Sequence, residues 1–353
     1  LIRAMRDNSV EVAVVGPTVG DGRSLFEEQG PWCHRVSGIR RLYGGGQSLV
    51  GKALYAPVRL LVNVLIAWDL LRFFRRFQPD LVVLNSWSAR FAALPALAMG
   101  FPIVWHLHEY LQGSGLPARM SRLFVTTCST HLVFNSRATR SWWLRGATVR
   151  NEHVLYDGIE LSSSPMRDTE RDVDVLYVGR VSIEKGVKDL LTACEQFVAA
   201  GRRFKLVLAG PLTADWSNES LAQSLARLGG QATYVGAVDD PREWMRRSRV
   251  LVLPSHREGL GRVILEAMAE RCAIVATNIG GIPEIVVDGR DALLVPAHDP
   301  LRLYQALDML LHDDTLRAHM TENAYARVAS HFTSEHLKSA IRQIYLEDVW
   351  RIP

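Results

Sequence analysis

Cysteine is scarce in this chain of 353 residues, which contains four. Cys33, Cys128, Cys194 and Cys272 are scattered, and they form neither a C-x-x-C pair nor the ligand spacing of a zinc site. So few cysteines in a chain of this length do not make the disulfide framework of a small secreted domain. We therefore expect reduced, mostly buried thiols in a cytosolic protein.

Long apolar runs are also lacking. The most apolar stretch, residues 60–68, is interrupted by Asn63, whereas a helix that crosses a membrane needs about 20 apolar residues. Residues 1–11 carry charge throughout and lack the continuous apolar segment of a signal peptide. We therefore expect a cytoplasmic protein in which residues 60–68 form a buried helix face.

Negative charge is sparse in the first half of the chain. Residues 1–150 hold 18 Lys and Arg against 8 Asp and Glu, a net charge of +10, and the remainder holds 23 against 29, a net charge of −6. A basic half is typical of proteins that bind an anionic membrane surface, a lipid phosphate or an anionic glycan. It is equally typical of a solvated arginine-rich surface. The basic run Arg72-Phe-Phe-Arg75-Arg76 points to a peripheral membrane association at the inner face, and we expect no nucleic acid as partner.

What the chain has in quantity is apolar material arranged in short segments. Hydrophobic residues make up 48% and charged residues 22%, which suits two globular domains in a chain of this length. Short apolar runs alternate with helical patterns, as in parallel α/β layers. The first series of predicted strands comprises residues 10–15, 80–84, 103–106, 131–134 and 153–155. The second comprises residues 173–178, 205–209, 233–235, 250–253, 273–276 and 292–295.

Helical spacing predicts helices over residues 54–77, 89–99, 299–311 and 334–350. A run rich in Ser, Pro and charge, residues 161–172, reads as a linker. Residues 1–7 resemble the end of a helix, whereas a doubly wound domain normally opens with a strand and a glycine-rich turn. We therefore expect an N-terminally incomplete sequence that lacks its first strand.

The strongest chemical motif runs from Glu258 to Ala269, with the sequence E-G-L-G-R-V-I-L-E-A-M-A. It follows the predicted strand 250–253, so Glu258 falls in a turn at the carboxyl end of a strand, where α/β sheets bind ligands. Glu266 falls in the first turns of the helix that begins near Gly261, and the two carboxylates are up to roughly 12 Å apart. That spacing suits hydroxyl groups at opposite ends of one ligand, with a diphosphate at the helix N-terminus between them. The alternative is a capping glutamate followed by a surface glutamate.

A second motif, G-R-V-S-I-E-K-G, spans residues 179–186 directly after the predicted strand 173–178. Arg180 and Lys185 on a loop bounded by glycines can clamp a phosphate. The alternative is a solvated basic loop. The two motifs complement one another, since cations suit phosphates and carboxylates suit hydroxyls.

With these motifs the chain resembles the retaining glycosyltransferases of family 4, which have the GT-B fold. The pattern G-R-x-x-x-x-K-G is followed by V-x-x-x-P-S-x-x-E-G-x-G-x-x-x-x-E-A-M-A and then by G-G-x-P-E-I-V, all present in this order between residues 179 and 286. The resemblance implies an α/β fold of two Rossmann-like domains that face each other across a cleft. The expected domains are residues 1–165 on the acceptor side, residues 166–334 for the donor, and a C-terminal helix, residues 335–353, that packs back on the first domain.

The resemblance also implies roles for single residues. Arg180 and Lys185 would hold the donor diphosphate, Glu266 the ribose hydroxyls and Glu258 the transferred sugar. The expected donor-binding residues are Gly179, Arg180, Lys185, Val238, Glu258, Gly259, Leu260, Gly261 and Glu266. Residues 234–238 would line the base pocket.

Residues 102–109 resemble a family strand that ends in His-Asp, and this implies that His108 binds the sugar near the reacting carbon. The expected catalytic residues are therefore His108, Glu258, Arg180 and Lys185. A histidine at a strand end is also commonly a packing residue. Here Glu109 replaces the usual Asp, and the glycine-rich loop after the first strand of the family is absent.

Two other patterns resemble cofactor-binding motifs, but each lacks a residue that its motif requires. Residues 46–52 match most of a phosphate-binding loop, but Ala53 stands where Ser or Thr must hold Mg²⁺. His108-Glu109 lacks the second histidine of a zinc protease motif, because Gln112 occupies that position. We expect no metal and no cofactor, with a nucleotide diphosphate sugar as donor substrate.

The resemblance therefore implies transfer of a hexosyl unit, with retention, from a nucleotide diphosphate sugar to an acceptor hydroxyl. The expected acceptor is a glycan or a lipid-linked acceptor in cell-surface glycan or glycolipid synthesis, as in polysaccharide biosynthesis. Two alternatives stay open, a non-catalytic nucleotide-sugar-binding protein and a nucleotide-sugar epimerase of the same fold. The donor base, whether UDP, GDP or another, also stays open.

Overall fold

The computed structural model describes residues 11–17, 32–36, 56–111, 115–147, 149–161 and 170–349. The chain divides into two compact units. The first unit comprises residues 1–135, 140–155 and 338–353, and the second comprises residues 136–139 and 156–337. The assignment of residues 1–165 to the acceptor and of residues 166–334 to the donor stays a prediction.

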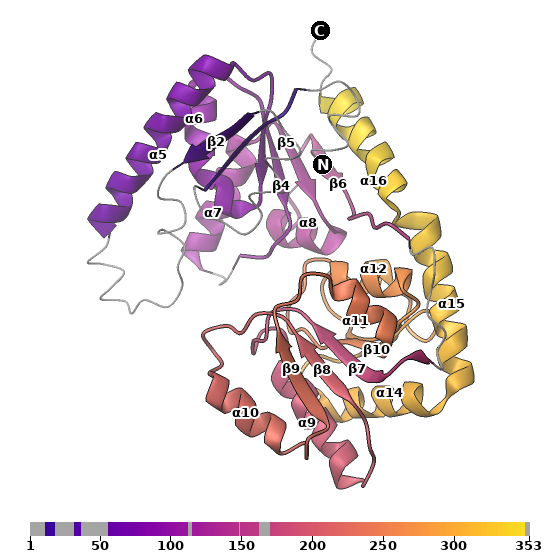
Figure 1. Cartoon of the computed structure of the whole chain (residues 1–353). Helices are drawn as coiled ribbons and strands as arrows, with labels where there is room; N and C mark the ends of the chain where they lie inside the picture. The colour runs from indigo at the N-terminus through magenta and orange to yellow at the C-terminus, as the bar shows by residue number, and fades with distance from the viewer. Residues whose placement is uncertain are drawn as a thin grey trace. The chain divides into compact units, whose positions relative to one another are not determined.

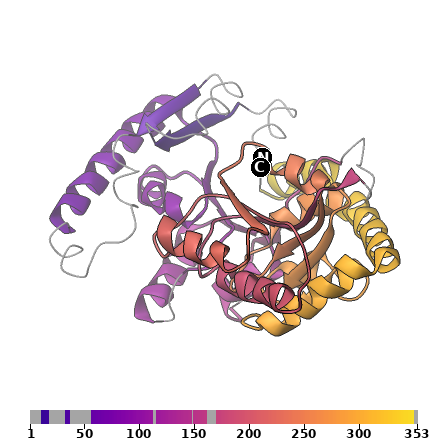
Figure 2. The same ribbon diagram turned by 60° about the horizontal axis from the view of Figure 1, so that its bottom comes forward.

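The first unit is built on a parallel four-stranded sheet in the order β3-β4-β5-β6, and a separate parallel pair is formed by β1 and β2. The indigo strands β1 and β2 run side by side near α5 in Figure 2. The elements of this unit are β1 (Ala13–Pro17), β2 (Trp32–Val36), α5 (Ala56–Phe77), β3 (Val82–Asn85), the 3-10 helix η1 (Trp87–Ala92), α6 (Ala93–Ala98), β4 (Ile103–Leu107), α7 (Leu116–Cys128), β5 (His131–Phe134), α8 (Arg137–Leu144), β6 (Glu152–Val154), α16 (Ser334–Ile341) and the π-helical segment η3 (Arg342–Val349). The first residues of α8 and α16 are counted with the second unit.

The core of the first unit follows from two periodicities. On α5, Leu70 and Phe74 lie one turn apart and are 0% and 4% exposed. On β4, Trp105 and Leu107 are alternate residues and point to the same side of the sheet. All four belong to one apolar cluster, so α5 covers that face of the sheet.

The buried helix face expected over residues 60–68 is wrong for most of its described residues, 63–68. Ile66 is buried, but Val64, Leu65 and Trp68 are each more than half exposed. These three side chains lie on the side of α5 that faces away from the apolar cluster.

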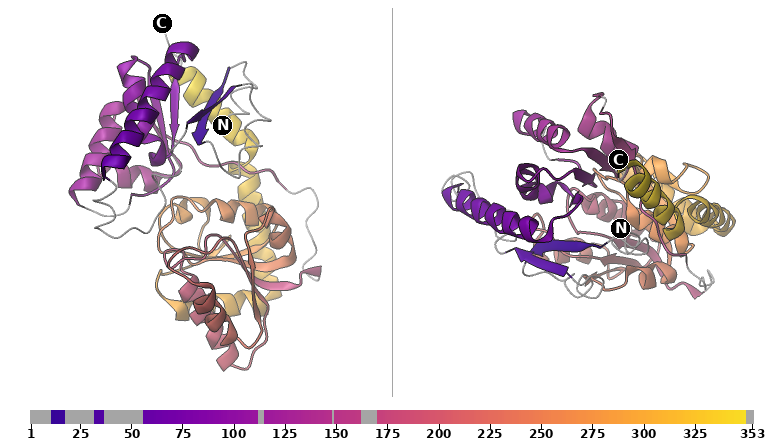
Figure 3. Two further views of the ribbon diagram at one scale, coloured as in Figure 1. Left: turned by 60° about the vertical axis from the view of Figure 1, so that its left-hand side comes forward. Right: turned by 90° about the horizontal axis from the view of Figure 1, so that it is seen from above.

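The second unit is a six-stranded parallel sheet in the order β12-β11-β10-β7-β8-β9. Its elements, labelled in Figure 1 where there is room, are β7 (Val173–Val178), α9 (Val187–Ala199), β8 (Leu206–Ala209), α10 (Asn218–Ala226), β9 (Ala232–Gly236), α11 (Pro241–Arg247), β10 (Ser248–Leu253), α12 (Arg262–Ala269), β11 (Ala273–Thr277), α13 (Ile282–Ile285), β12 (Leu293–Val295), α14 (Pro300–His312) and α15 (Asp314–His331). Strands that alternate with helices and pair only in parallel are the pattern of a doubly wound fold. Figure 3 shows the helices around the sheet from two further sides.

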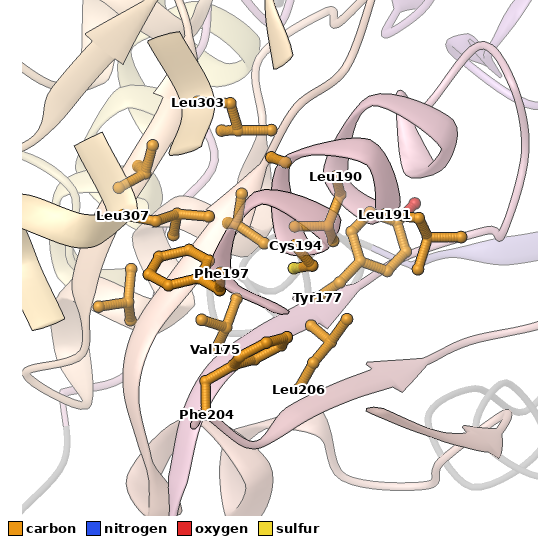
Figure 4. Packing of buried hydrophobic residues seen from close by; sticks show 14 of the residues in the cluster. Val175, Tyr177, Leu190, Leu191, Cys194, Phe197, Phe204, Leu206, Leu303 and Leu307 are labelled. Carbon is orange, nitrogen blue, oxygen red and sulfur yellow. The ribbon is translucent and has the colours of Figure 1, made fainter. Parts of the chain in front are cut away.

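Alternate residues of each central strand face opposite layers of helices. Val250 and Val252 belong to a cluster that includes residues of α9 and α14, whereas Leu251 and Leu253 belong to a cluster that includes residues of α12 and α15. Figure 4 shows the first of these clusters, in which Phe197 of α9 lies close to Val175 and Leu307. Because both faces of the sheet are covered at its centre, β7 and β10 are apolar along most of their length and the polar side chains gather at the strand ends.

The predicted strands match the structure closely, with one omission. Strand β2 was not predicted, because His34 and Arg35 interrupt its apolar pattern. The single helix expected over residues 89–99 is wrong in detail, since η1 is followed by α6. Pro95 has no backbone N–H to continue an α-helical hydrogen-bond ladder from the preceding turn, which explains the change.

The predicted helix over residues 334–350 is α16 followed by the π-helical segment η3.

Cys128, Cys194 and Cys272 are free and buried, as expected. None of the helices in the described part of the chain is both long and apolar enough to cross a membrane. Residues 1–7, residues 46–52 and most of the predicted linker lie outside the described residues.

Candidate functional site

The two predicted motifs meet at the switch point of the second sheet. Strands β7 and β10 are hydrogen-bonded neighbours, with Val175 opposite Val250. From this pair, β8 and β9 follow on one side and β11 and β12 on the other. In doubly wound sheets, ligands bind outside the carboxyl ends of the strands at such a reversal. The loops that leave β7 and β10 there carry residues 179–186 and 254–261.

An ion pair joins these loops. Nζ of Lys185 lies 2.7 Å from Oε2 of Glu258, and the two side chains are 17% and 15% exposed. The hydroxyl of Ser255 donates to the same oxygen at 3.3 Å, and Oγ of Ser182 accepts a hydrogen bond from the backbone N–H of Lys185 at 3.1 Å. The ammonium keeps further N–H donors for an anionic ligand, and Oε1 of Glu258 keeps acceptor capacity for a hydroxyl.

Glycine makes the close approach of the loops possible. Gly186 has φ +70°, and a Cβ atom there would lie 1.8 Å from the carbonyl oxygen of Pro254. Any larger residue would therefore push the two loops apart. The backbone N–H of His256 also donates to the carbonyl of Glu184 at 2.8 Å. The position of Lys185 beside Glu258 thus depends on backbone contacts as well as on charge.

The second predicted carboxylate lies on α12. This helix begins at Arg262 after Gly261, which has φ +89°. Glu266 is half-buried, and its Oε1 lies 3.2 Å from Nε of Arg262. Burial raises the pKa of Glu266, although the nearby Arg262 and Arg242 oppose the shift. The first N–H groups of α12, like those of any helix, have no partner within the helix and suit an anion.

The remaining predicted donor residues lie at the same edge of the sheet. Arg180 is exposed, and its carbonyl accepts a hydrogen bond from the hydroxyl of Tyr177 at 2.6 Å. The backbone N–H of Gly179 donates to the carbonyl of Ala209 at 2.9 Å. Val238 is half-buried in the loop after β9, and Leu260 is buried in the loop after β10.

His108 belongs to the first unit and follows β4. Its Nε2 lies 2.6 Å from Oδ1 of Asn85, the last residue of β3. An amide oxygen only accepts, so Nε2 donates its proton in this contact. Sequence reasoning missed Asn85, which the pairing of β3 with β4 brings beside His108.

The neighbours of His108 have structural tasks. His106 is buried beside it, with ring centroids 4.1 Å apart, and burial together with His108 lowers the pKa of His106 well below its ordinary value. The Glu109 carboxylate accepts from the hydroxyl of Ser86 at 2.7 Å and from the backbone N–H of Trp87 at 2.6 Å. Glu109 therefore anchors the start of η1.

A group of side chains with metal-ligand chemistry lies in the second unit. Asp189, His256 and His298 each offer one ligand atom, and these atoms all lie within 4.8 Å of one another. Oδ2 of Asp189 lies 2.7 Å from Nε2 of His256. No sequence pattern predicted this group, because its members lie on three separate segments.

Comparison with known proteins decides the family. Two family models match, one described as Glycosyltransferase Family 4 over residues 1–163 and one as Glycosyl transferases group 1 over residues 163–327. A D-inositol 3-phosphate glycosyltransferase of Xylanimonas cellulosilytica is 30% identical over 311 residues, which are 78% of this chain and 73% of the relative. The chain belongs to glycosyltransferase family 4.

Other relatives of this family 4 glycosyltransferase match over a shorter length. The capsular polysaccharide biosynthesis glycosyltransferase CapM of Staphylococcus aureus is 28% identical over 169 residues, and the chain spans 44% of its length. Among solved structures, Anabaena HepE in complex with UDP and glucose is 19% identical and superposes with a TM-score of 0.80 over 98% of this chain and 94% of HepE. The predicted GT-B fold, with two Rossmann-like α/β units, is confirmed.

Proposed function

We propose that this glycosyltransferase moves a hexosyl unit from a nucleotide diphosphate sugar to an acceptor hydroxyl, with retention of the anomeric configuration. The observation that carries the proposal is the half-buried Lys185–Glu258 pair at the switch point of the second sheet. It sets a cation beside a carboxylate that can accept hydrogen bonds from sugar hydroxyls, at the place where doubly wound folds bind nucleotides.

In this proposal different donor-binding residues contact the diphosphate, the sugar, the ribose and the base. Lys185 and Arg180 bind the diphosphate, with Gly179 and the turn Gly259-Leu260-Gly261 supplying backbone close to it. Glu258 accepts from hydroxyls of the sugar, and Glu266 accepts from hydroxyls of the ribose. Val238 contacts the base.

Catalysis would depend on stabilising the leaving group. The bond from the anomeric carbon to an oxygen of the β-phosphate breaks, the acceptor oxygen bonds to that carbon and releases its proton to the departing diphosphate, and negative charge develops on this diphosphate as it leaves. Lys185 and Arg180, together with the N-terminus of α12, lie where they can stabilise that charge. His108, oriented by Asn85, is proposed to bind the sugar near the reacting carbon.

The relatives favour particular donors and acceptors. HepE is bound to UDP and glucose, so a UDP-hexose is the first donor to test. CapM is named for capsular polysaccharide biosynthesis, which supports an acceptor in the synthesis of a cell-surface glycan or glycolipid. We propose no metal as a requirement of the transfer step, since its charges are met by side chains and a helix N-terminus.

We also propose that the first unit contacts an anionic membrane surface at the cytoplasmic face. Val64, Leu65 and Trp68 of α5 are 56%, 58% and 53% exposed, and the exposed Arg72 and Arg75 follow on the same helix. Apolar side chains next to cations are typical of helices that lie on anionic lipid. The net charge of +10 in residues 1–150 supports the same partner.

Product analysis tests the proposed reaction. The protein is incubated with UDP-glucose, other UDP-hexoses and GDP-hexoses, with glycan and glycolipid acceptors, and products are followed by NMR. Transfer with release of free nucleotide and retained configuration is expected. Inversion would contradict the retaining mechanism, a changed sugar still attached to its nucleotide would identify an epimerase, and binding without turnover would identify a non-catalytic protein.

A further inference from the structure

We infer that Asp189, His256 and His298 form a binding site for a divalent transition metal, with Zn²⁺ as the ion of best fit. Two imidazoles and one carboxylate are a common protein ligand set for zinc, which is completed by water in a fourth position. Hard ions such as Mg²⁺ prefer oxygen ligands alone, so this set selects against them. None of its three residues is among the proposed donor-binding residues.

The three ligand atoms already converge. Nε2 of His256 lies 2.7 Å from Oδ2 of Asp189, and the rings of His256 and His298 have centroids 3.7 Å apart. A zinc ion with bonds of about 2.0–2.2 Å holds its ligand atoms roughly 3.3 Å apart. Since the atoms here span at most 4.8 Å, small side-chain rotations close the site.

The surroundings of the group suit a bound ion. The side chains of Asp189 and His256 are 18% and 14% exposed, so the two ligands are held within the protein. His298 is exposed, which leaves an entry path from solvent and room for a water ligand. Two of the ligands are thus partly buried, and the third is open to solvent.

The backbone conformation at His298 is compatible with this role. Its φ is +62°, in the left-handed region where Gly, Asn, Asp and His occur more often than other residues. In this conformation the His298 imidazole lies against the ring of His256.

A metal at this site would link the start of α9 to two loops at one edge of the second sheet. Asp189 lies in the first turn of α9, four residues after Lys185, and His256 lies two residues before Glu258. His298 follows β12. The ion would therefore brace the two loops that carry the Lys185–Glu258 pair.

Direct metal titration tests the inference without any measurement of glycosyl transfer. Zn²⁺ and Co²⁺ are titrated into the chelator-treated full-length protein, followed by calorimetry and by the visible absorption of four-coordinate Co²⁺. The critical variant is His298→Gly, because glycine removes the imidazole and fits the positive φ. His256→Gln removes the second imidazole, and His319→Ala, at an exposed histidine of α15, is the matched control.

The expected result is saturable binding of one ion by the native chain and by His319→Ala. Mutation of a residue that only hydrogen-bonds to a metal ligand typically lowers metal affinity by about 10–100-fold. His298→Gly and His256→Gln remove a ligand itself, so each should lower the metal affinity by at least this factor. The unfolding temperature of metal-free His298→Gly should equal or exceed that of the native chain, which excludes misfolding as the cause. Absence of binding by the native chain, or equal binding by all the variants, would overturn the inference.

Discussion

Lys185 and Glu258 are 73 positions apart in the chain, yet Nζ of one lies 2.7 Å from Oε2 of the other. Parallel pairing of β7 with β10 brings their loops to the same edge, and Gly186 allows the loops to touch. Each charge therefore holds the other in place before any ligand binds. Such preorganisation is what electrostatic catalysis requires, because the charges need not rearrange during reaction.

Removal of the cation should weaken nucleotide binding. A hydrogen bond to a charged group contributes about 1.5–3 kcal/mol, so Lys185→Ala is expected to lower the affinity for the nucleotide diphosphate by roughly 10–100-fold. The measurement is calorimetric titration of the nucleotide. Lys188→Ala, at an exposed lysine on α9, is the control and should bind normally, and equal effects of both variants would point to general charge rather than to this site.

The approach of the two loops should depend on Gly186. Alanine in a left-handed conformation costs about 1–2 kcal/mol, and Gly201→Ala, with φ +67° and no atom within 4 Å of the added Cβ, should show this cost alone. Gly186→Ala should lose about 1–3 kcal/mol more, because its Cβ would meet the carbonyl of Pro254. Urea denaturation measures both variants, and similar losses of stability would show that the loops are not in contact.

The half-buried carboxyl of Glu266 should make stability depend on pH. Because burial raises its pKa in the folded state, the folded protein binds this proton more tightly than the unfolded chain does. The contribution to stability is present at acid pH and is lost as pH rises from the ordinary glutamate pKa through the raised one. Glu266→Gln is therefore expected to raise the free energy of unfolding at neutral pH and to leave it nearly unchanged at acid pH.

Urea denaturation at a series of pH values checks this expectation. Glu160→Gln, at an exposed glutamate outside the helices, is the control and should be as stable as the native chain at every pH. A loss of stability at neutral pH in Glu266→Gln would mean that the pair with Arg262 outweighs the cost of burial.

The exposed face of α5 should determine binding to lipid. Arg72, Arg75 and Arg76 are exposed, and each cation near an anionic surface contributes about 1 kcal/mol. Replacement of all three by Gln is expected to release the protein from vesicles that contain phosphatidylserine, as measured by co-sedimentation. Replacement of the exposed Lys188, Arg203 and Arg227 of the second unit is the control, and equal release in both variants would reject α5 as the contact.

Much of the fold could be predicted from the sequence because its strands are short, apolar and regularly spaced. The buried strands β7 and β10 read directly from their apolar runs, and the glycines that follow each strand marked the loops. Strand β2 could not be predicted, since its polar residues mask the period. The change from η1 to α6 depends on the local effect of Pro95.

The sequence motifs identified residues of the candidate site, but they did not predict which of these residues contact one another. Glu258 and Lys185 were identified by motif, but their contact depends on the strand order, which the sequence does not state. Asn85 beside His108, and the group of Asp189, His256 and His298, are products of tertiary structure alone. The roles of the individual residues stay predictions.

Calorimetric titration of UDP, GDP and ADP, and of their sugars, is the most direct test of the central claim that the second unit binds a nucleotide diphosphate sugar at the Lys185–Glu258 pair. The native chain and an Arg180→Ala/Lys185→Ala variant are compared, with folding of both verified by circular dichroism. We predict that one nucleotide binds the native chain and that its affinity collapses in the variant. Failure of every nucleotide to bind the well-folded native chain, or undiminished binding by the variant, would contradict the claim.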